Sequence, residues 1–258
     1  MSNHVNHLLA QWLPFKNKHK WVLGFIFKTE GSCYRKAGAM MLFSDAGHQL
    51  GILSGGCLES DIVKKAQRVM TDGVSRTAVY DDEDEEDIAF KLGVGCGGVV
   101  HLALVPVNES NQYLSLDVVS KSLSNGKACE WRCAVDGTLG DCTELEDHSA
   151  KRRKAVLDTV DGKRMLSVLM LPPIHLLVVG GGYDATFMTK LASLQGYLVS
   201  LWDPRPAQAR LEHFPEVNYL IEDPSTEGLR LHMGEHNVQA AVLMSHHREI
   251  DAKALQVL

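Results

Sequence analysis

Two cysteines of this chain lie in glycine-rich segments where a thiol can meet a ligand. Segment 54–59 reads Ser-Gly-Gly-Cys-Leu-Glu around Cys57, and segment 93–98 reads Gly-Val-Gly-Cys-Gly-Gly around Cys96. Glycine has no Cβ atom, so its backbone lets a ligand come close and can turn N–H groups toward an anion. A buried structural cysteine needs no such neighbours. The pattern therefore predicts that both thiols meet a bulky, anionic partner.

The residues after Cys57 favour an ionised thiol. Apolar side chains recur at helical spacing from residue 58 and predict a helix that ends near Gly73. Cys57 then stands at the helix start, where unpaired N–H groups and the helix dipole stabilise a thiolate. The alternative for Cys57 is a buried, inert thiol. For Cys96 the alternative is that its glycines simply form a tight turn before a strand.

Two cations and two glycines complete the candidate site in the first half of the chain. Arg35 and Lys36 fall in a loop between two predicted strands. Together with the N–H groups of Gly55 and Gly56, these cations are suited to hold a phosphate. The alternative for Arg35 and Lys36 is a solvated surface pair.

Composition places the chain among globular proteins with a sizeable core. Of its 258 residues, 45% are hydrophobic and 22% are charged. The net charge of −6 is local, because residues 81–87 are all acidic. We therefore expect neither a nucleic-acid nor a membrane partner. The chain has no signal-peptide pattern and no apolar run of about 20 residues, which predicts a cytoplasmic protein.

The pattern changes after Pro172 and Pro173. An apolar strand at 174–179 leads into three glycines, a helix follows, and a second strand ends at Asp203. This is the βαβ arrangement of a nucleotide-binding fold. We predict an α/β protein with a mixed α/β, cysteine-containing domain at residues 1–172. A Rossmann-like, doubly wound parallel-sheet domain follows at residues 173–258.

The second domain carries its own candidate contacts. Gly180 and Gly182 are expected to admit a pyrophosphate, and Asp203, 21 residues after Gly182, to accept ribose hydroxyls. Arg205 can instead accommodate a 2′-phosphate, which leaves NAD and NADP open. His246 is expected at the same crevice, with a plain surface histidine as the alternative. The chain stops within a predicted helix, whereas a complete doubly wound domain continues for about two more strands.

These motifs together resemble the XdhC/CoxI family of accessory factors for xanthine and carbon monoxide dehydrogenases. The matching segments are 34–40, 54–59 and 93–98 in the first domain, and 179–182, 203–206 and 245–251 in the second. Tyr183 and Asp184 depart from the His-Val that the family pattern has after the glycines.

The resemblance implies a maturation factor that binds molybdenum cofactor, the molybdopterin-bound metal, and protects its sulfurated form. Such a factor delivers the cofactor to a molybdenum hydroxylase of the xanthine dehydrogenase type, with a cysteine desulfurase supplying sulfur. A homodimer would suit a large ligand shared between domains. Thiolates are good partners for a soft metal centre. Cys57 is therefore the expected molybdenum contact or transient sulfur acceptor, with Cys96 as its partner.

Two other functions stay open at this point. An NAD(P)-dependent oxidoreductase would use the second domain, where His246 or His247 would have to act as the general acid. A persulfide-carrying sulfurtransferase would use Cys57 without any pterin. A cofactor-insertion chaperone, in contrast, binds and delivers its cargo without turning over a small substrate.

Overall fold

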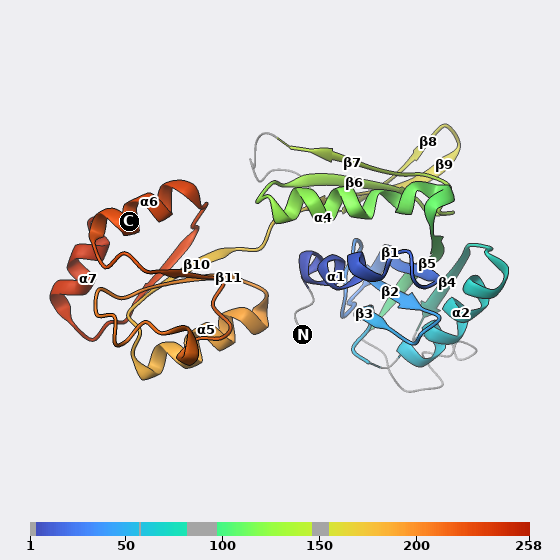
Figure 1. The fold of residues 1–258 in the computed structure, drawn as a ribbon. Helices are drawn as coiled ribbons and strands as arrows, with labels where there is room; N and C mark the ends of the chain where they lie inside the picture. Colours follow the sequence, from blue (N-terminus) through green and yellow to red (C-terminus); the bar gives the residue numbers. More distant parts are fainter. Residues whose placement is uncertain (1–3, 57, 82–96, 146–154) are drawn as a thin grey trace. The chain divides into compact units, whose positions relative to one another are not determined.

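The computed structural model in Figure 1 describes residues 4–56, 58–81, 97–145 and 155–258. The chain divides into two compact units, one of Val5–Pro172 and one that contains Pro173–Leu258. The first unit has two antiparallel sheets and the second has a parallel sheet, each with helices. The predicted α/β class with a Rossmann-like second part is confirmed. In the described ranges no helix is long and apolar enough to cross a membrane.

The first unit is organised around a five-stranded antiparallel sheet with the order β3-β2-β1-β5-β4. Its two central strands are the longest, and they pair from Trp21 opposite Val107 to Gly31 opposite Gly98. Helix α2 packs on this sheet through an apolar stripe and ends at Gly73, which adopts a left-handed conformation. The elements are β1 (Trp21–Gly31), β2 (Met40–Ser44), β3 (Gln49–Gly51), α2 (Glu59–Asp72), β4 (Arg76–Asp81) and β5 (Gly98–Val107).

A second antiparallel sheet, β7-β6-β9-β8, completes this unit. Helix α1 packs on β2 and β3, helix α4 packs on β6 and β7, and the two helices contact each other. Phe25 of β1 meets Trp131 of β6 edge to face, with ring centroids 5.8 Å apart. Cys129 and Cys133 point into this core and are fully buried. The remaining elements are α1 (Val5–Trp12), η1 (Leu13–Phe15), η2 (Glu109–Ser115), α4 (Leu116–Ser124), β6 (Cys129–Ala134), β7 (Gly140–Glu144), β8 (Ala155–Val160) and β9 (Lys163–Met170).

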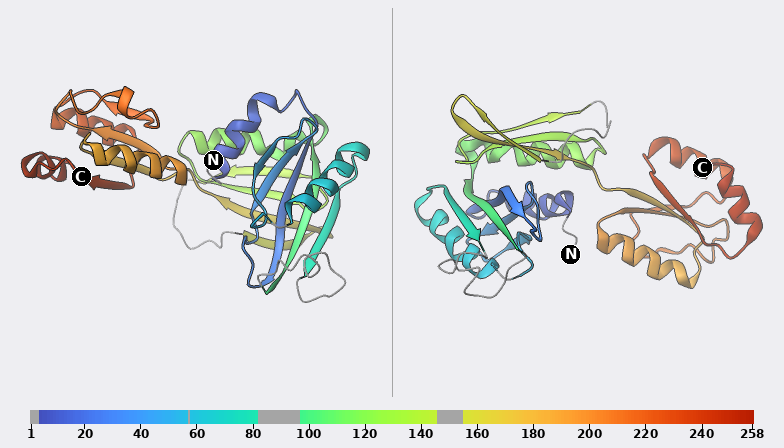
Figure 2. Two further views of the ribbon diagram at one scale, coloured as in Figure 1. Left: turned by 90° about the horizontal axis from the view of Figure 1, so that it is seen from below. Right: turned by 180° about the vertical axis from the view of Figure 1, so that it is seen from behind.

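The second unit is a parallel sheet with the order β12-β11-β10-β13 and helices on both faces. Helix α5 covers one face, and α6 and α7 cover the other (Figures 1 and 2). Alternate residues of β10 serve the two faces: Leu176 and Val178 pack with α5, whereas Leu177 and Val179 pack with α6 and α7. The elements are β10 (His175–Val179), α5 (Tyr183–Gln195), β11 (Leu198–Trp202), η3 (Leu211–His213), β12 (Tyr219–Ile221), α6 (Thr226–Glu235), β13 (Ala240–Leu243) and α7 (Arg248–Leu255).

Candidate functional site

The antiparallel order of the five-stranded sheet brings three separate sequence segments to one end. β1 ends where β5 begins, because Gly31 pairs with Gly98. β2 begins and β3 ends at this same end, with Met41 opposite Gly51. The loop after β1, the loop after β3 and the residue before β5 therefore emerge together. Residues far apart in the chain thus reach a common surface.

Four of the predicted binding residues lie at this end of the sheet. The two predicted thiols are not among the residues that the structure describes. Arg35 and Lys36 lie in the loop after β1, and Gly55 and Gly56 lie in the loop after β3. Cys57 and Cys96 lie outside the described residues. Their described neighbours along the chain, Gly56 and Gly97, both belong to this end of the sheet.

Ser54 ties the glycine loop to the start of α2. Its hydroxyl oxygen accepts hydrogen bonds from the N–H groups of Gly56 at 3.3 Å and Leu58 at 3.1 Å, and it donates to the Glu59 carboxylate. Glu59 also accepts from the Ser54 N–H at 2.8 Å. The Glu59 carboxylate therefore stabilises the loop through its hydrogen bonds to Ser54. Among the described residues no atom lies within 4 Å of the place that a Cβ would take at Gly56, whose φ is +103°, so the described structure leaves this side of the loop open.

The loop after β1 brings an aromatic ring and two cations beside this glycine loop. The ring of Tyr34 contacts the position of a Cβ at Gly55, at 3.7 to 3.8 Å. The Nε of Arg35 is buried and finds no hydrogen-bond partner among the described residues. Lys36 is exposed, and its ammonium donates to the Gly31 carbonyl at 3.4 Å. Arg35 thus has an unused donor in the loop whose Tyr34 ring contacts Gly55.

Cys33 also lies at this end, although its sequence context gave no sign of it. Its Sγ is 3.3 Å from the Glu30 carbonyl oxygen and 3.5 Å from the Val99 carbonyl oxygen. Gly98 makes this approach possible, because a Cβ there would stand 2.4 Å from the Glu30 oxygen and 2.8 Å from the Cys33 sulfur. The glycine beside β5 therefore serves strand packing, and it joins the loop after β1 to the segment that precedes β5.

The glycine turn of the second unit is closely packed. Gly180 has φ of +110°, and a Cβ there would stand 2.5 Å from the Cα of Ser245. A Cβ at Gly181 would stand 2.7 Å from the backbone of Gln208. Gly182 is different, because the nearest atom to its Cβ position is the His246 ring at 4.0 Å. Two of the three glycines are thus needed where loops of the protein meet.

The Asp203 carboxylate is fully engaged by the protein itself. Its Oδ1 accepts from the N–H and Nε of Arg205, both at 2.9 Å, and its Oδ2 accepts from Arg205 Nη2 and the Gly181 N–H, both at 2.8 Å. Burial raises the pKa of Asp203, but these hydrogen bonds outweigh burial and leave the pKa below its usual value. Arg205 also donates to the Ser245 carbonyl at 3.2 Å. The pair predicted to meet a ribose or a 2′-phosphate holds the ends of β10, β11 and β13 together.

Comparison with known proteins identifies the family of this chain. The XdhC and CoxI family matches residues 15–81, which include the loops after β1 and β3. The XdhC Rossmann domain matches residues 176–258. The chain belongs to the XdhC/CoxI family.

The same family connection appears in individual relatives. The chain is 28% identical to a probable xanthine dehydrogenase subunit from Bacillus subtilis strain 168, over 94% of this chain and 77% of that protein. It is 24% identical to the molybdenum cofactor insertion chaperone PaoD of Escherichia coli K12, over 80% of this chain and 60% of that protein. A crystal structure of a xanthine dehydrogenase from Bacillus halodurans matches the whole chain and 79% of its own length, with a TM-score of 0.77 and 28% identity.

The departure of this chain from the XdhC/CoxI pattern at 183–184 has a structural counterpart. Asp184 stands in the first turn of α5, and its carboxylate is 2.9 Å from the Nε2 of His246. His246 has φ of +55°, a conformation that few non-glycine residues adopt. Both side chains are exposed, and the His246 ring is the nearest neighbour of the Cβ position at Gly182. In this XdhC/CoxI protein a hydrogen-bonded Asp184–His246 pair therefore stands beside the start of α5.

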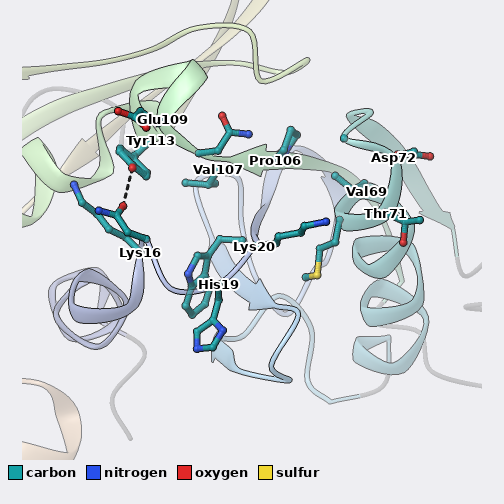
Figure 3. A pocket seen from close by; sticks show the side chains of 15 residues that line it. Lys16, His19, Lys20, Val69, Thr71, Asp72, Pro106, Val107, Glu109 and Tyr113 are labelled. Atoms are coloured by element: carbon teal, nitrogen blue, oxygen red, sulfur yellow. Dashed lines mark hydrogen bonds between the residues drawn. The ribbon is translucent and has the colours of Figure 1, made fainter.

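A cavity of about 680 Å³ opens at the opposite end of the five-stranded sheet, where β1 begins and β5 ends (Figure 3). In Figure 3 the Lys20 side chain extends across it toward α2. Its lining contains none of the binding residues predicted from sequence. Within the described ranges no group of three metal-ligating side chains could hold a metal ion. The described candidate site is therefore the loop end of the sheet.

Proposed function

We propose that this XdhC/CoxI protein binds molybdenum cofactor as its cargo and delivers it to a molybdenum hydroxylase of the xanthine dehydrogenase type. The observation that carries the proposal is the meeting of the Arg35–Lys36 loop with the Gly55–Gly56 loop at one end of a sheet. The names of the two relatives, one a part of a xanthine dehydrogenase and the other a molybdenum cofactor insertion chaperone, support the same cargo and client.

The described residues suit the anionic part of this cargo. A phosphate is held best by cations and by N–H groups that need no side-chain space around them. Arg35 has a buried Nε without a partner in the described structure, and Lys36 is an exposed cation. Gly56 is exposed, and the space beside it is open. These groups would hold the phosphate end of molybdopterin.

The metal end of the cargo calls for sulfur. Cys57 follows Gly56 directly in the sequence and precedes α2 by one residue. Because molybdenum and its sulfido group are soft, a thiolate is a suitable contact. In this proposal Cys57 contacts the metal centre or accepts sulfur transiently, and Cys96 assists it. A cysteine desulfurase as sulfur donor and a homodimer as the binding form belong to the same proposal.

A loading experiment tests the function and the role of Cys57 separately. Purified protein is incubated with molybdenum cofactor and passed through a desalting column, and the retained pterin and molybdenum are quantified. We expect stoichiometric loading of the wild type and at least about tenfold weaker retention by Cys57→Ala, the equivalent of about 1.4 kcal/mol. Cys142→Ala is the matched control, because Cys142 is a half-buried cysteine of β7 in the other sheet.

The two possible failures have different meanings. A wild type that retains no cofactor contradicts the proposed function. A Cys57→Ala variant that loads fully and activates the client dehydrogenase fully contradicts only the role of that thiol. Sulfur bound to Cys57 without any pterin would favour the sulfurtransferase alternative.

A nucleotide function of the second unit has weaker support. Asp203 and Arg205 are bound to each other and to Gly181, so a ribose would have to displace protein groups. Gly182 and the exposed start of α5 leave room for a ligand there. Titration with NADH, followed by its fluorescence enhancement, tests this alternative directly. A saturable increase in NADH fluorescence would support NAD(P) binding by the second unit.

A further inference from the structure

Tyr34 is an aromatic residue displayed at the centre of the candidate site. Its side chain is 63% exposed, which is unusual for a large ring that is only partly polar. It stands in the loop after β1, next to Arg35, and its ring contacts the glycine loop at Gly55. An exposed ring that packs on a glycine loop and is followed in the chain by two cations is well placed to meet an anionic ligand.

The contact with Gly55 shows how the ring is oriented. A Cβ at Gly55 would lie 3.7 Å from Cδ2, 3.8 Å from Cε2 and 3.8 Å from Cγ of Tyr34. Near-equal distances to three consecutive ring atoms put that point above the face of the ring, since a point beside the edge would be clearly closer to one atom. One face of Tyr34 therefore covers the glycine backbone. The large exposure of the residue leaves the other face to solvent.

Two contacts restrict Tyr34: its neighbour Cys33 is held by backbone carbonyls, and its own ring packs on Gly55. The Cys33 sulfur is within hydrogen-bond distance of the Glu30 and Val99 carbonyls. Arg35 is half-buried. A side chain that is already positioned loses less conformational entropy when a ligand packs against it. Tyr34 has the geometry of a prepared platform.

We propose that Tyr34 is the residue on which the flat pterin ring of the cargo stacks. This inference rests on the function proposed above and names the part of the site that recognises the heterocycle. The planar pyrimidine ring of the pterin gains from stacking on an aromatic face, whereas the phosphate at the other end of molybdopterin is suited to Arg35, Lys36 and the exposed Gly56 backbone. The blander alternative is that Tyr34 only shields the backbone of Gly55.

Two substitutions of Tyr34 distinguish covering the Gly55 backbone from stacking on the pterin. Tyr34→Phe keeps the aromatic face, whereas Tyr34→Leu keeps an apolar cover for Gly55 and removes the π system. Tyr183→Leu is the matched control, because Tyr183 is 77% exposed and belongs to the second unit. Each protein is titrated with molybdenum cofactor, bound pterin is measured after ultrafiltration, and the pterin absorption band is recorded.

We expect Tyr34→Phe and Tyr183→Leu to bind within about twofold of the wild type, and Tyr34→Leu to bind about tenfold to a hundredfold more weakly. Stacking also lowers the intensity of the pterin absorption band, and this change should vanish in Tyr34→Leu alone. If Tyr34→Leu binds like the wild type with the same absorption change, the inference is wrong and the proposed function stands. If the wild type binds no cofactor, the proposed function itself fails.

Discussion

Segments 54–56 and 180–182 both place glycines between a strand and a helix, and their surroundings are opposite. At Gly180 a Cβ would meet the backbone of Ser245 at 2.5 Å, whereas at Gly56 it would meet no described residue within 4 Å. Glycine is therefore required at position 180 because two loops of the protein touch there. Among the described residues, nothing fills the space beside Gly56. The backbone at Gly56 is therefore open to a ligand in the described structure, whereas the backbone at Gly180 is not.

The charged residues near the two turns differ in the same way. Asp203 and Arg205 satisfy each other and the turn at Gly181. Arg35, beside the other turn, keeps a buried Nε without a partner in the described structure. A glycine motif thus indicates that a side chain would not fit at that position. The neighbouring atoms show whether the space is filled by the protein or is left for a ligand.

Alanine substitution of one glycine in each turn should show the difference between the two turns most clearly. Gly180→Ala combines a positive φ with a backbone clash and should lower the free energy of unfolding of the second unit by about 4 kcal/mol. Gly56→Ala has the strained φ alone and should cost about 1 kcal/mol. Hydrogen exchange resolved by peptide, at increasing urea, assigns each loss to its own unit. Equal costs at the two positions would refute the contrast.

Asp203→Asn should give the next largest effect, about 2 to 3 kcal/mol, because it leaves Arg205 and the turn without a carboxylate. Asp184→Asn is the control, since Asp184 is exposed and should cost less than about 0.5 kcal/mol. Both are measured by exchange of β10 peptides. If Asp203→Asn costs no more than Asp184→Asn, the bracing role of Asp203 is wrong.

The lowered pKa of Asp203 adds a pH test of the same brace. The folded pKa lies below the usual 3.8, so the unfolded chain takes up the proton first as the pH falls. The stability from this group is therefore fully present above about pH 5, begins to fall as the pH approaches the unfolded value of 3.8, and is lost as the pH drops through the lower folded pKa. The wild type should lose its advantage over Asp203→Asn across that range. A constant difference between the two proteins down to about pH 3 would contradict this assignment.

In the open turn, Ser54→Ala should have a smaller effect than Gly180→Ala or Asp203→Asn. The substitution removes the acceptor of the Gly56 and Leu58 N–H groups and the donor to Glu59, and should cost about 1 to 2 kcal/mol. Faster exchange should be confined to the first turn of α2. Ser60→Ala, an exposed neighbour on the same helix, should leave exchange unchanged. A global loss of stability would mean that this turn is packed as tightly as the other.

Much of the fold follows from local sequence patterns, and the failures have a local cause as well. Strands β1 and β10 contain continuous buried runs, which is why their apolar segments identify them. Strands β7 and β8 are mostly exposed or half-buried and lack an apolar alternation, so the pattern does not reveal them. The second sheet of the first unit was therefore missed as a sheet, although β6 belongs to it and has a clear buried pattern.

The candidate site shows a different limit of sequence reasoning. Arg35, Lys36 and the glycines at 55 and 56 could be chosen from residue type, because their chemistry is local. Their meeting depends on strand pairing between distant segments, which no short pattern specifies. Asp203 was recognised from its spacing, but its saturation by Arg205 depends on side-chain geometry. Tyr34 was missed because an aromatic residue in a loop has no distinctive spacing.

The pairing of Gly31 with Gly98 has a consequence for biosynthesis. A ribosome that has translated as far as the acidic segment 81–87 has already made the loops after β1 and β3, but not β5. Since β5 lies beside β1 in the middle of the sheet, the nascent polypeptide at this stage has an incomplete sheet. It also lacks the start of β5, which belongs to the end of the sheet where the loops after β1 and β3 emerge. The end of the sheet where we propose that the cargo binds is therefore complete only after β5 has been translated and has paired with β1.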